Sequence, residues 1–115
     1  MSSSLKIQIT KVEDLLTGKS KIIMRISDEY GFVKNAKIYI KKLSKKKKMK
    51  SLDFQYKETS SDKYSIFETE EFPVLPIGKY FYEISLILNE VQCYIVFDEN
   101  SNPVIINEEE FFKEE

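Results

Sequence analysis

Apolar and polar residues alternate along most of this chain, which is the pattern of β-strands with one buried face and one wet face. The alternation predicts about seven antiparallel strands, with turn signals between them at regular spacing. The predicted strands span Leu5–Thr10, Lys19–Ser27, Ala36–Lys41, Leu52–Lys57, Tyr64–Thr69, Tyr80–Leu88 and Val91–Phe97, and a last extended piece spans Val104–Ile106. Between the first two strands, Val12–Gly18 breaks the alternation and predicts a turn or a single helical turn. Because no helical pattern separates the strands, we expect an all-β sandwich rather than alternating βα units.

The longest predicted strand is preceded by two prolines and a glycine. Pro73 and Pro76 cannot donate ladder hydrogen bonds, and Gly78 relaxes the backbone just before the strand, so this stretch is predicted to turn a corner between sheets. The spacing Gly78-x-Tyr80-x-Tyr82 resembles the tyrosine corner of immunoglobulin-like sandwiches. The resemblance implies that the Tyr80 hydroxyl bonds to backbone a few residues upstream and that Tyr82 faces inward. The alternative is that both tyrosines only pack on an inner face.

Composition agrees with a small β-domain. The chain has 115 residues, 42% of them hydrophobic, and phenylalanine and tyrosine occur 8 and 7 times, whereas alanine occurs once. We expect one immunoglobulin-like sandwich over residues 1–106 and an acidic tail or short helix over residues 107–115. The start lacks the features of a signal peptide and no run is long enough to span a membrane, so we expect neither secretion by a signal peptide nor a membrane partner.

The residues of common catalytic and metal sites are scarce. There is no histidine, and Cys93 is the single cysteine, predicted to point into the core as an inert thiol. Asp98–Pro103 has the acid and amide spacing of a calcium-binding EF-hand loop, but Pro103 stands where that loop needs a glycine, so an ordinary polar turn is predicted. We therefore expect a protein that is not an enzyme, with no catalytic residue, cofactor or metal.

The most basic stretch is Lys41–Lys50, and nine of the 18 basic residues lie between positions 34 and 50. Its centre holds the candidate interaction residues Lys45, Lys46, Lys47 and Lys48. Lysines at a hairpin tip can contact phosphates, but without interleaved aromatic residues or arginines they are not expected to read a base sequence. The same run is compatible with a nuclear localisation signal. The remaining alternative is a solvated loop that keeps a sheet edge from pairing with other chains.

The C-terminus has the opposite charge and two adjacent aromatic residues. Asn107 and Glu110 have the spacing of a capping box, which predicts a short helix from Glu108. Phe111 and Phe112 need a surface to dock on, either the flank of the same domain or a neighbouring molecule. The basic segment and the acidic tail together would favour head-to-tail contact between copies.

Three segments resemble immunoglobulin-like domains of tailed-phage virion proteins, such as the amino-terminal domain of the baseplate upper protein. They are IMRISDEYG at 23–31, KNAKIYI at 34–40 and PIGKYFYEISLIL at 76–88. The resemblance implies a non-enzymatic phage structural protein, a capsid decoration or connector protein that docks in many copies on a larger assembly by protein–protein interaction. It would reside in the virion, or in the cytoplasm of the producing cell.

Two other functions remain open at this stage. The same sandwich could be a carbohydrate-binding accessory module, although such modules display exposed tryptophans or a flat tyrosine platform and this chain has no tryptophan. A nucleic-acid-binding protein would use Lys41–Lys50, and its binding would be non-specific and steeply salt-dependent.

Overall fold

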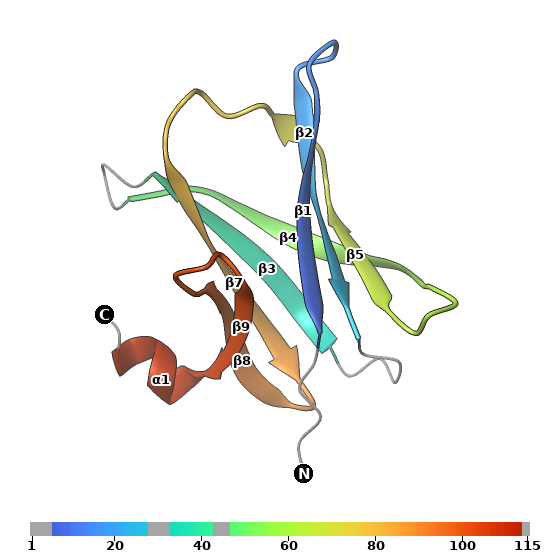
Figure 1. Cartoon of the computed structure of the whole chain (residues 1–115), viewed down its shortest axis with the longest axis vertical. Coiled ribbons are helices and arrows are strands. Elements are labelled where there is room, and N and C mark those ends of the chain that lie inside the picture. The colour runs from blue at the N-terminus through green and yellow to red at the C-terminus, as the bar shows by residue number, and fades with distance from the viewer. Residues whose placement is uncertain (1–5, 28–32, 43–46, 114–115) are drawn as a thin grey trace. The chain divides into compact units, whose positions relative to one another are not determined.

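The computed structural model describes residues 6–27, 33–42 and 47–113 (Figure 1). The described residues contain nine strands, all paired antiparallel, and one short C-terminal helix. The all-β fold and the C-terminal helix are therefore confirmed. The strand count exceeds the predicted number because a two-residue strand, β6 (Phe72–Pro73), and the extended piece, β9 (Pro103–Asn107), both pair in a sheet.

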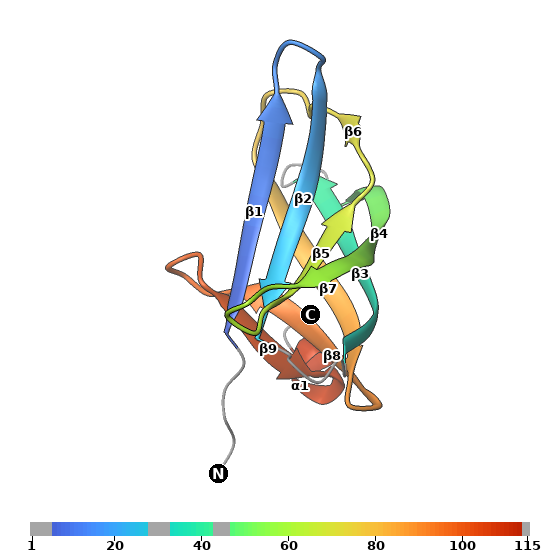
Figure 2. The same ribbon diagram turned by 90° about the vertical axis from the view of Figure 1, so that its right-hand side faces the viewer.

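The chain divides into two compact units, and the first comprises Met1–Gly31 and Phe54–Leu75. Its sheet has the order β1-β2-β5-β4, where β1 is Ile7–Asp14, β2 is Lys19–Ile26, β5 is Ser65–Thr69 and β4 contributes its second half. The side chains on one face of this sheet are buried and form the core, namely Ile22, Met24, Ile26, Phe54, Phe67 and Phe72. Figure 2 shows β1 and β2 running side by side to a tight turn.

The first strand is longer than predicted. The sequence placed its end at Thr10, because Val12–Gly18 does not alternate, but β1 continues to Asp14 and pairs residue by residue with β2 as far as Lys19. The turn is confined to residues 15–18. Backbone hydrogen bonds to a neighbouring strand stabilise a β-strand even where its apolar and polar side chains do not alternate.

The second unit comprises Phe32–Asp53 and Pro76–Glu115. Its sheet has the order β4-β3-β7-β8-β9, where β3 is Val33–Lys42, β7 is Tyr80–Leu88 and β8 is Val91–Phe97. Helix α1 is Glu108–Lys113 and follows β9 directly. The fully buried residues of this unit are Ile38, Ile40, Ile84, Leu86 and Ile95.

Strand β4 (Lys47–Thr59, 13 residues) takes part in both sheets and joins them into one nine-stranded path, so the strand pairing does not show the two separate sheets of the predicted seven-stranded sandwich. Its first half pairs with β3 through Asp53, and its second half pairs with β5 from Phe54 onward. The sequence predicted only Leu52–Lys57, because the preceding lysines carry no alternation of apolar residues. One continuous strand therefore supplies ladder partners to both sheets.

The buried Thr69 side chain accepts a hydrogen bond from β2 at the point where the pairing of β2 changes from β5 to β6. β2 pairs with β5 over Ile23–Ile26 and with β6 over Lys19–Ser20. Between these ladders, the Ile22 N–H donates to the Thr69 hydroxyl oxygen at 3.0 Å, and Thr69 is buried. The hydroxyl takes the place of a missing backbone acceptor.

We predict that Thr69→Val destabilises the protein by about 1 to 3 kcal/mol, since the isosteric valine leaves the buried Ile22 N–H without its acceptor. Urea unfolding followed by circular dichroism measures the change. Thr10→Val, at an exposed position of β1, is the matched control and should shift stability by less than about 0.5 kcal/mol. Equal stability of the Thr69 and Thr10 variants would contradict the role given to this hydroxyl.

Candidate functional site

The predicted basic tip is only partly within the described residues. Lys45 and Lys46 lie outside them. The backbones of Lys47 and Lys48 belong to β4 and pair with β3 opposite Lys42 and Lys41. The proposed contacts of this tip with nucleic acid therefore stay predictions.

Two lysines near this tip are neutralised by acids of neighbouring strands. The Lys41 ammonium pairs with the Glu83 carboxylate of β7, and the two side chains are only 23% and 16% exposed. Lys37 pairs with Asp53 of β4 at 3.6 Å, at the surface. These pairs arise from strand register, so the linear run of lysines did not reveal them. They reduce the positive charge that the second unit offers to a ligand.

Helix α1 is held by the capping box that the sequence predicted. The Glu110 N–H donates to the Asn107 side-chain oxygen at 2.8 Å, and the Asn107 N–H donates to the Glu110 carboxylate at 3.4 Å. The prediction of a helix starting at Glu108 is confirmed. The reciprocal pair satisfies two N–H groups that the first turn would otherwise leave free.

The two phenylalanines of α1 contact Tyr94 of β8. The Phe111 ring stacks on Tyr94 of β8 with 4.0 Å between centroids and 8° between planes. Phe112 meets the edge of Tyr94 at 6.2 Å and remains 56% exposed. Of the two docking alternatives, the contact of Phe111 favours the flank of its own domain. Sequence reasoning missed Tyr94, although its place between inward-facing Cys93 and Ile95 already put it on the outer face.

The Tyr80 hydroxyl donates to the Pro76 carbonyl at 2.7 Å, which is the upstream backbone bond predicted for it. A Cβ on Gly78 would lie 3.5 Å from the Lys42 Cε and 3.7 Å from the Tyr80 ring, which are ordinary contacts, so steric room does not require the glycine. Tyr82 is half-buried and pairs with Ile40 of β3. The Tyr80 hydroxyl is therefore engaged with the backbone just before β7.

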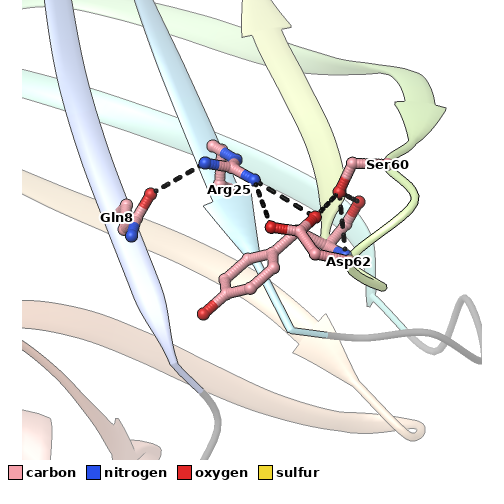
Figure 3. A network of polar contacts seen from close by, with 5 residues as sticks. Gln8, Arg25, Ser60 and Asp62 are labelled. Carbon is pink, nitrogen blue, oxygen red and sulfur yellow. Dashed lines mark hydrogen bonds and ion pairs between the residues drawn. The ribbon is translucent and has the colours of Figure 1, made fainter.

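A polar cluster in the first unit was not predicted. Arg25, the single arginine of the chain, donates from Nη1 to the Gln8 side-chain oxygen at 3.2 Å and from Nη2 to the Asp62 carboxylate at 3.1 Å (Figure 3). Its guanidinium carbon lies 4.8 Å from the centroid of the Tyr64 ring. The cluster joins β1, β2 and the turn between β4 and β5. The Nη1 and Nη2 groups of Arg25 are engaged within the first unit, whereas its buried Nε has no hydrogen-bond partner among the described residues.

The turn side of this cluster is held by Ser60. Its hydroxyl donates to the Asp62 carboxylate and accepts the Tyr64 N–H at 3.2 Å. The Ser60 hydrogen bond, with the nearby Arg25 charge, lowers the pKa of Asp62 below its ordinary value of 3.8, against a smaller opposing effect of desolvation.

The segment that resembles a calcium loop forms the turn between β8 and β9. The Asp98 carboxylate accepts the N–H groups of Asn100 and Asn102, each at 2.9 Å, and Ser101 adopts a positive φ of 63°. The Asp98 carboxylate therefore accepts hydrogen bonds from the backbone of the turn that contains it. Within residues 6–27, 33–42 and 47–113, no group of three or more His, Cys, Asp or Glu side chains is placed to hold a metal ion.

Cys93 is buried, as predicted, and burial raises the pKa of its thiol, which disfavours the reactive thiolate.

The described helix is too short to cross a membrane.

The most exposed apolar residues of the first unit lie at the tip of the β1–β2 hairpin. Leu15 is 83% exposed and Leu16 is 98% exposed. The turn that carries them is well defined, because the Asp14 carboxylate accepts the Leu16 N–H at 3.0 Å and the Asp14 carbonyl accepts the Gly18 N–H at 2.8 Å. We name Leu15 and Leu16 the leucine tip. The sequence placed a turn here but gave these leucines no role.

Comparisons with protein-family models, with curated proteins and with solved structures give no match to this chain.

We predict that acidification costs the wild type more stability than it costs Asp62→Asn. Since the folded-state pKa of Asp62 is lowered, its contribution is fully present above the ordinary value of 3.8 and is lost as the pH falls through the lowered value. Thermal unfolding across this acid range measures the difference. Ser60→Ala, which removes the largest cause of the shift, should give an intermediate pH dependence. Identical pH profiles for all three proteins would contradict the assignment.

We predict that Phe111→Ala destabilises the protein by about 1 to 3 kcal/mol, because it removes the ring stacked on Tyr94. Phe112→Ala is the matched control on the same helix and should cost less than about 1 kcal/mol. Chemical denaturation gives both values. A larger effect of the Phe112 variant would show that the two rings have been assigned the wrong roles.

Proposed function

We propose that this chain is a non-enzymatic, immunoglobulin-like structural module that docks in multiple copies on a larger assembly, as a virion decoration or connector protein. The proposal has three supports, namely the order of the strands, the hydrogen bond of Tyr80 and the exposed leucine tip. The leucine tip is the observation that carries the docking role.

Strand order supports the immunoglobulin-like assignment. In that fold one sheet has the order A-B-E-D and the other contains C-F-G. With β1, β2 and β3 taken as A, B and C, the order β1-β2-β5-β4 matches A-B-E-D, and β3-β7-β8 matches C-F-G. The two halves of β4 then correspond to C′ beside β3 and D beside β5. Strand β9 and helix α1 extend the second sheet beyond strand G.

The position of Tyr80 supports the same assignment. It opens β7, the strand that corresponds to F, and its hydroxyl reaches the carbonyl four residues upstream. A tyrosine near the start of strand F that bonds back to upstream backbone is a hallmark of immunoglobulin-like sandwiches.

The leucine tip supports a docking role. Turns between strands are usually polar, yet this one displays two adjacent leucines that no described residue covers. Burying a leucine side chain contributes roughly 1.5 to 3 kcal/mol. Because the turn is already held by Asp14, little conformational freedom is lost when a partner covers it. An apolar pair on a preformed turn is therefore suited to protein–protein contact.

Resemblance to virion domains supports the choice of assembly, since the segments that carry it include the Gly78-x-Tyr80 corner. The two alternatives have weaker support. Lys41, at one end of the basic segment, is paired with Glu83 rather than free for phosphate. A sugar-binding platform of tryptophans is excluded by composition.

Native particles from the producing source provide the test. We expect mass measurement and protein quantification to find this chain in a fixed number of copies per particle. The double variant Leu15→Ser/Leu16→Ser should fold normally but be depleted from the particles, because it lacks the apolar tip. Val91→Ser, which alters an exposed valine on the second unit, is the matched control and should be incorporated like the wild type. Absence of the wild-type chain from every particle would overturn the proposed function.

A further inference from the structure

We propose that two copies of this chain associate through their β1 strands, which pair antiparallel about a two-fold axis at Val12. The inference rests on the proposed function and names the partner of the exposed edge as a second copy of the chain. It is carried by the open edge of β1, by the direction of its backbone groups and by its charge pattern.

Strand β1 is the edge strand of the first sheet. Among the described residues, β2 alone pairs with it. It is eight residues long, its register with β2 has no shift, and it contains neither proline nor glycine. The outer strand at the end of the other sheet, β9, is five residues long and begins at Pro103. Natural proteins block edges with short strands, prolines, bulges or charged side chains, and of these β1 has only its charged residues, among them Lys11 and Glu13.

Pairing with β2 determines which backbone groups of β1 are free. The Ser27 N–H donates to the Lys6 carbonyl at 3.0 Å, so Lys6 directs its backbone toward β2. Direction alternates along an antiparallel strand, so even-numbered residues bond to β2. The odd-numbered residues Ile7, Ile9, Lys11 and Glu13 therefore direct their N–H and C=O groups to the open edge.

The charge pattern selects one register for two-fold pairing. Odd-numbered residues must face each other across the axis, and centres at Ile9, Thr10, Lys11 or Val12 meet this condition with at least five residues of each β1 strand paired. A centre at Ile9 sets Lys11 opposite Ile7 and leaves Glu13 beyond the paired residues. A centre at Lys11 sets two ammonium groups against each other, and a centre at Thr10 sets each charge opposite an isoleucine. A centre at Val12 sets Lys11 opposite Glu13 of the second copy, and this pairing occurs twice. Opposite charges in directly facing positions are favourable, and like charges are not.

The same register also accounts for exposed apolar residues. Val12, which is 41% exposed, then faces Val12 of the second copy. Beyond the strand, the leucine tip of each copy extends alongside Gln8 and Ile9 of the other. Association through β1 thus covers the open edge and leaves a leucine tip at each end of the paired segment. A two-fold contact is closed, so it produces a dimer rather than an open fibre.

Charge reversal tests the register. In the Lys11→Glu variant, positions 11 and 13, which face each other across the axis, both hold acids. In the Glu13→Lys variant, both hold lysines. Analytical ultracentrifugation should show that each variant alone dimerises at least about tenfold more weakly than the wild type. An equimolar mixture of the two variants should restore association, because each acidic edge then faces a basic one. Lys79→Glu, a charge reversal in the second unit, is the control and should dimerise like the wild type.

Mixing separates this contact from effects inside one chain. Lys11 and Glu13 also form an ion pair within β1 at 3.7 Å, and each variant breaks it whether mixed or alone. Hydrogen exchange supplies a second readout, since the Lys11 and Glu13 N–H groups should become protected as the wild-type concentration rises. Monomeric wild type throughout, or a mixture that associates no better than its components, would overturn the proposal.

The outcome is separable from that of the proposed function. A monomeric chain that still requires the leucine tip to enter particles would refute the β1 dimer and retain the docking role. A chain that dimerises through β1 but enters no particle would refute the docking role and retain the β1 dimer.

Discussion

The hydrogen-bond ladder of β4 is the constraint on which the rest of the structure depends. A strand in a sheet must find partners for its backbone N–H and C=O groups, and β4 finds them with β3 over its first half and with β5 over its second. Strands β3 and β5 each have another neighbour, β7 and β2, so both sheets are built outward from this one strand. The register shift between Tyr56 and Glu58 adjusts the second half of β4 to β5.

The strand order built outward from β4 ends at β9 on one side and at β1 on the other, and these two edge strands differ. At β9 the strand is short, begins at a proline and runs directly into α1, which packs its Phe111 on Tyr94 of β8. At β1 the strand is long and regular, and it leads to a turn that displays Leu15 and Leu16. The edge of β1 and two exposed leucines therefore lie together on one hairpin.

Polar side chains in this protein mostly reinforce backbone architecture. Thr69 accepts a backbone N–H where β2 changes neighbours, Asp14 and Asp98 hold their own turns, and Tyr80 closes the corner before β7. Arg25 is engaged with Gln8 and Asp62, and Lys41 with Glu83. These contacts lie within the described residues, although the buried Arg25 Nε has no hydrogen-bond partner among them, whereas Leu15 and Leu16 of the leucine tip are exposed.

The sequence by itself determined the features that depend on neighbours along the chain. Alternation located the strands with buried faces, the Asn107 and Glu110 spacing located α1, and the Gly78-x-Tyr80 spacing located a hydroxyl that bonds a carbonyl four residues away. Each of these interactions spans a few residues, so residue type and spacing suffice to predict it.

Only the tertiary structure decided the features that depend on which strands become neighbours. The lysine-rich start of β4 and the end of β1 are strands because a neighbour supplies ladder bonds, and their own side chains carry no such signal. The stacking of Phe111 on Tyr94, the pairing of Lys41 with Glu83 and the Arg25 cluster likewise join residues that strand pairing brings together. Strand order also left β1 with an open edge, which is a property of the sheet and not of the strand's own residues.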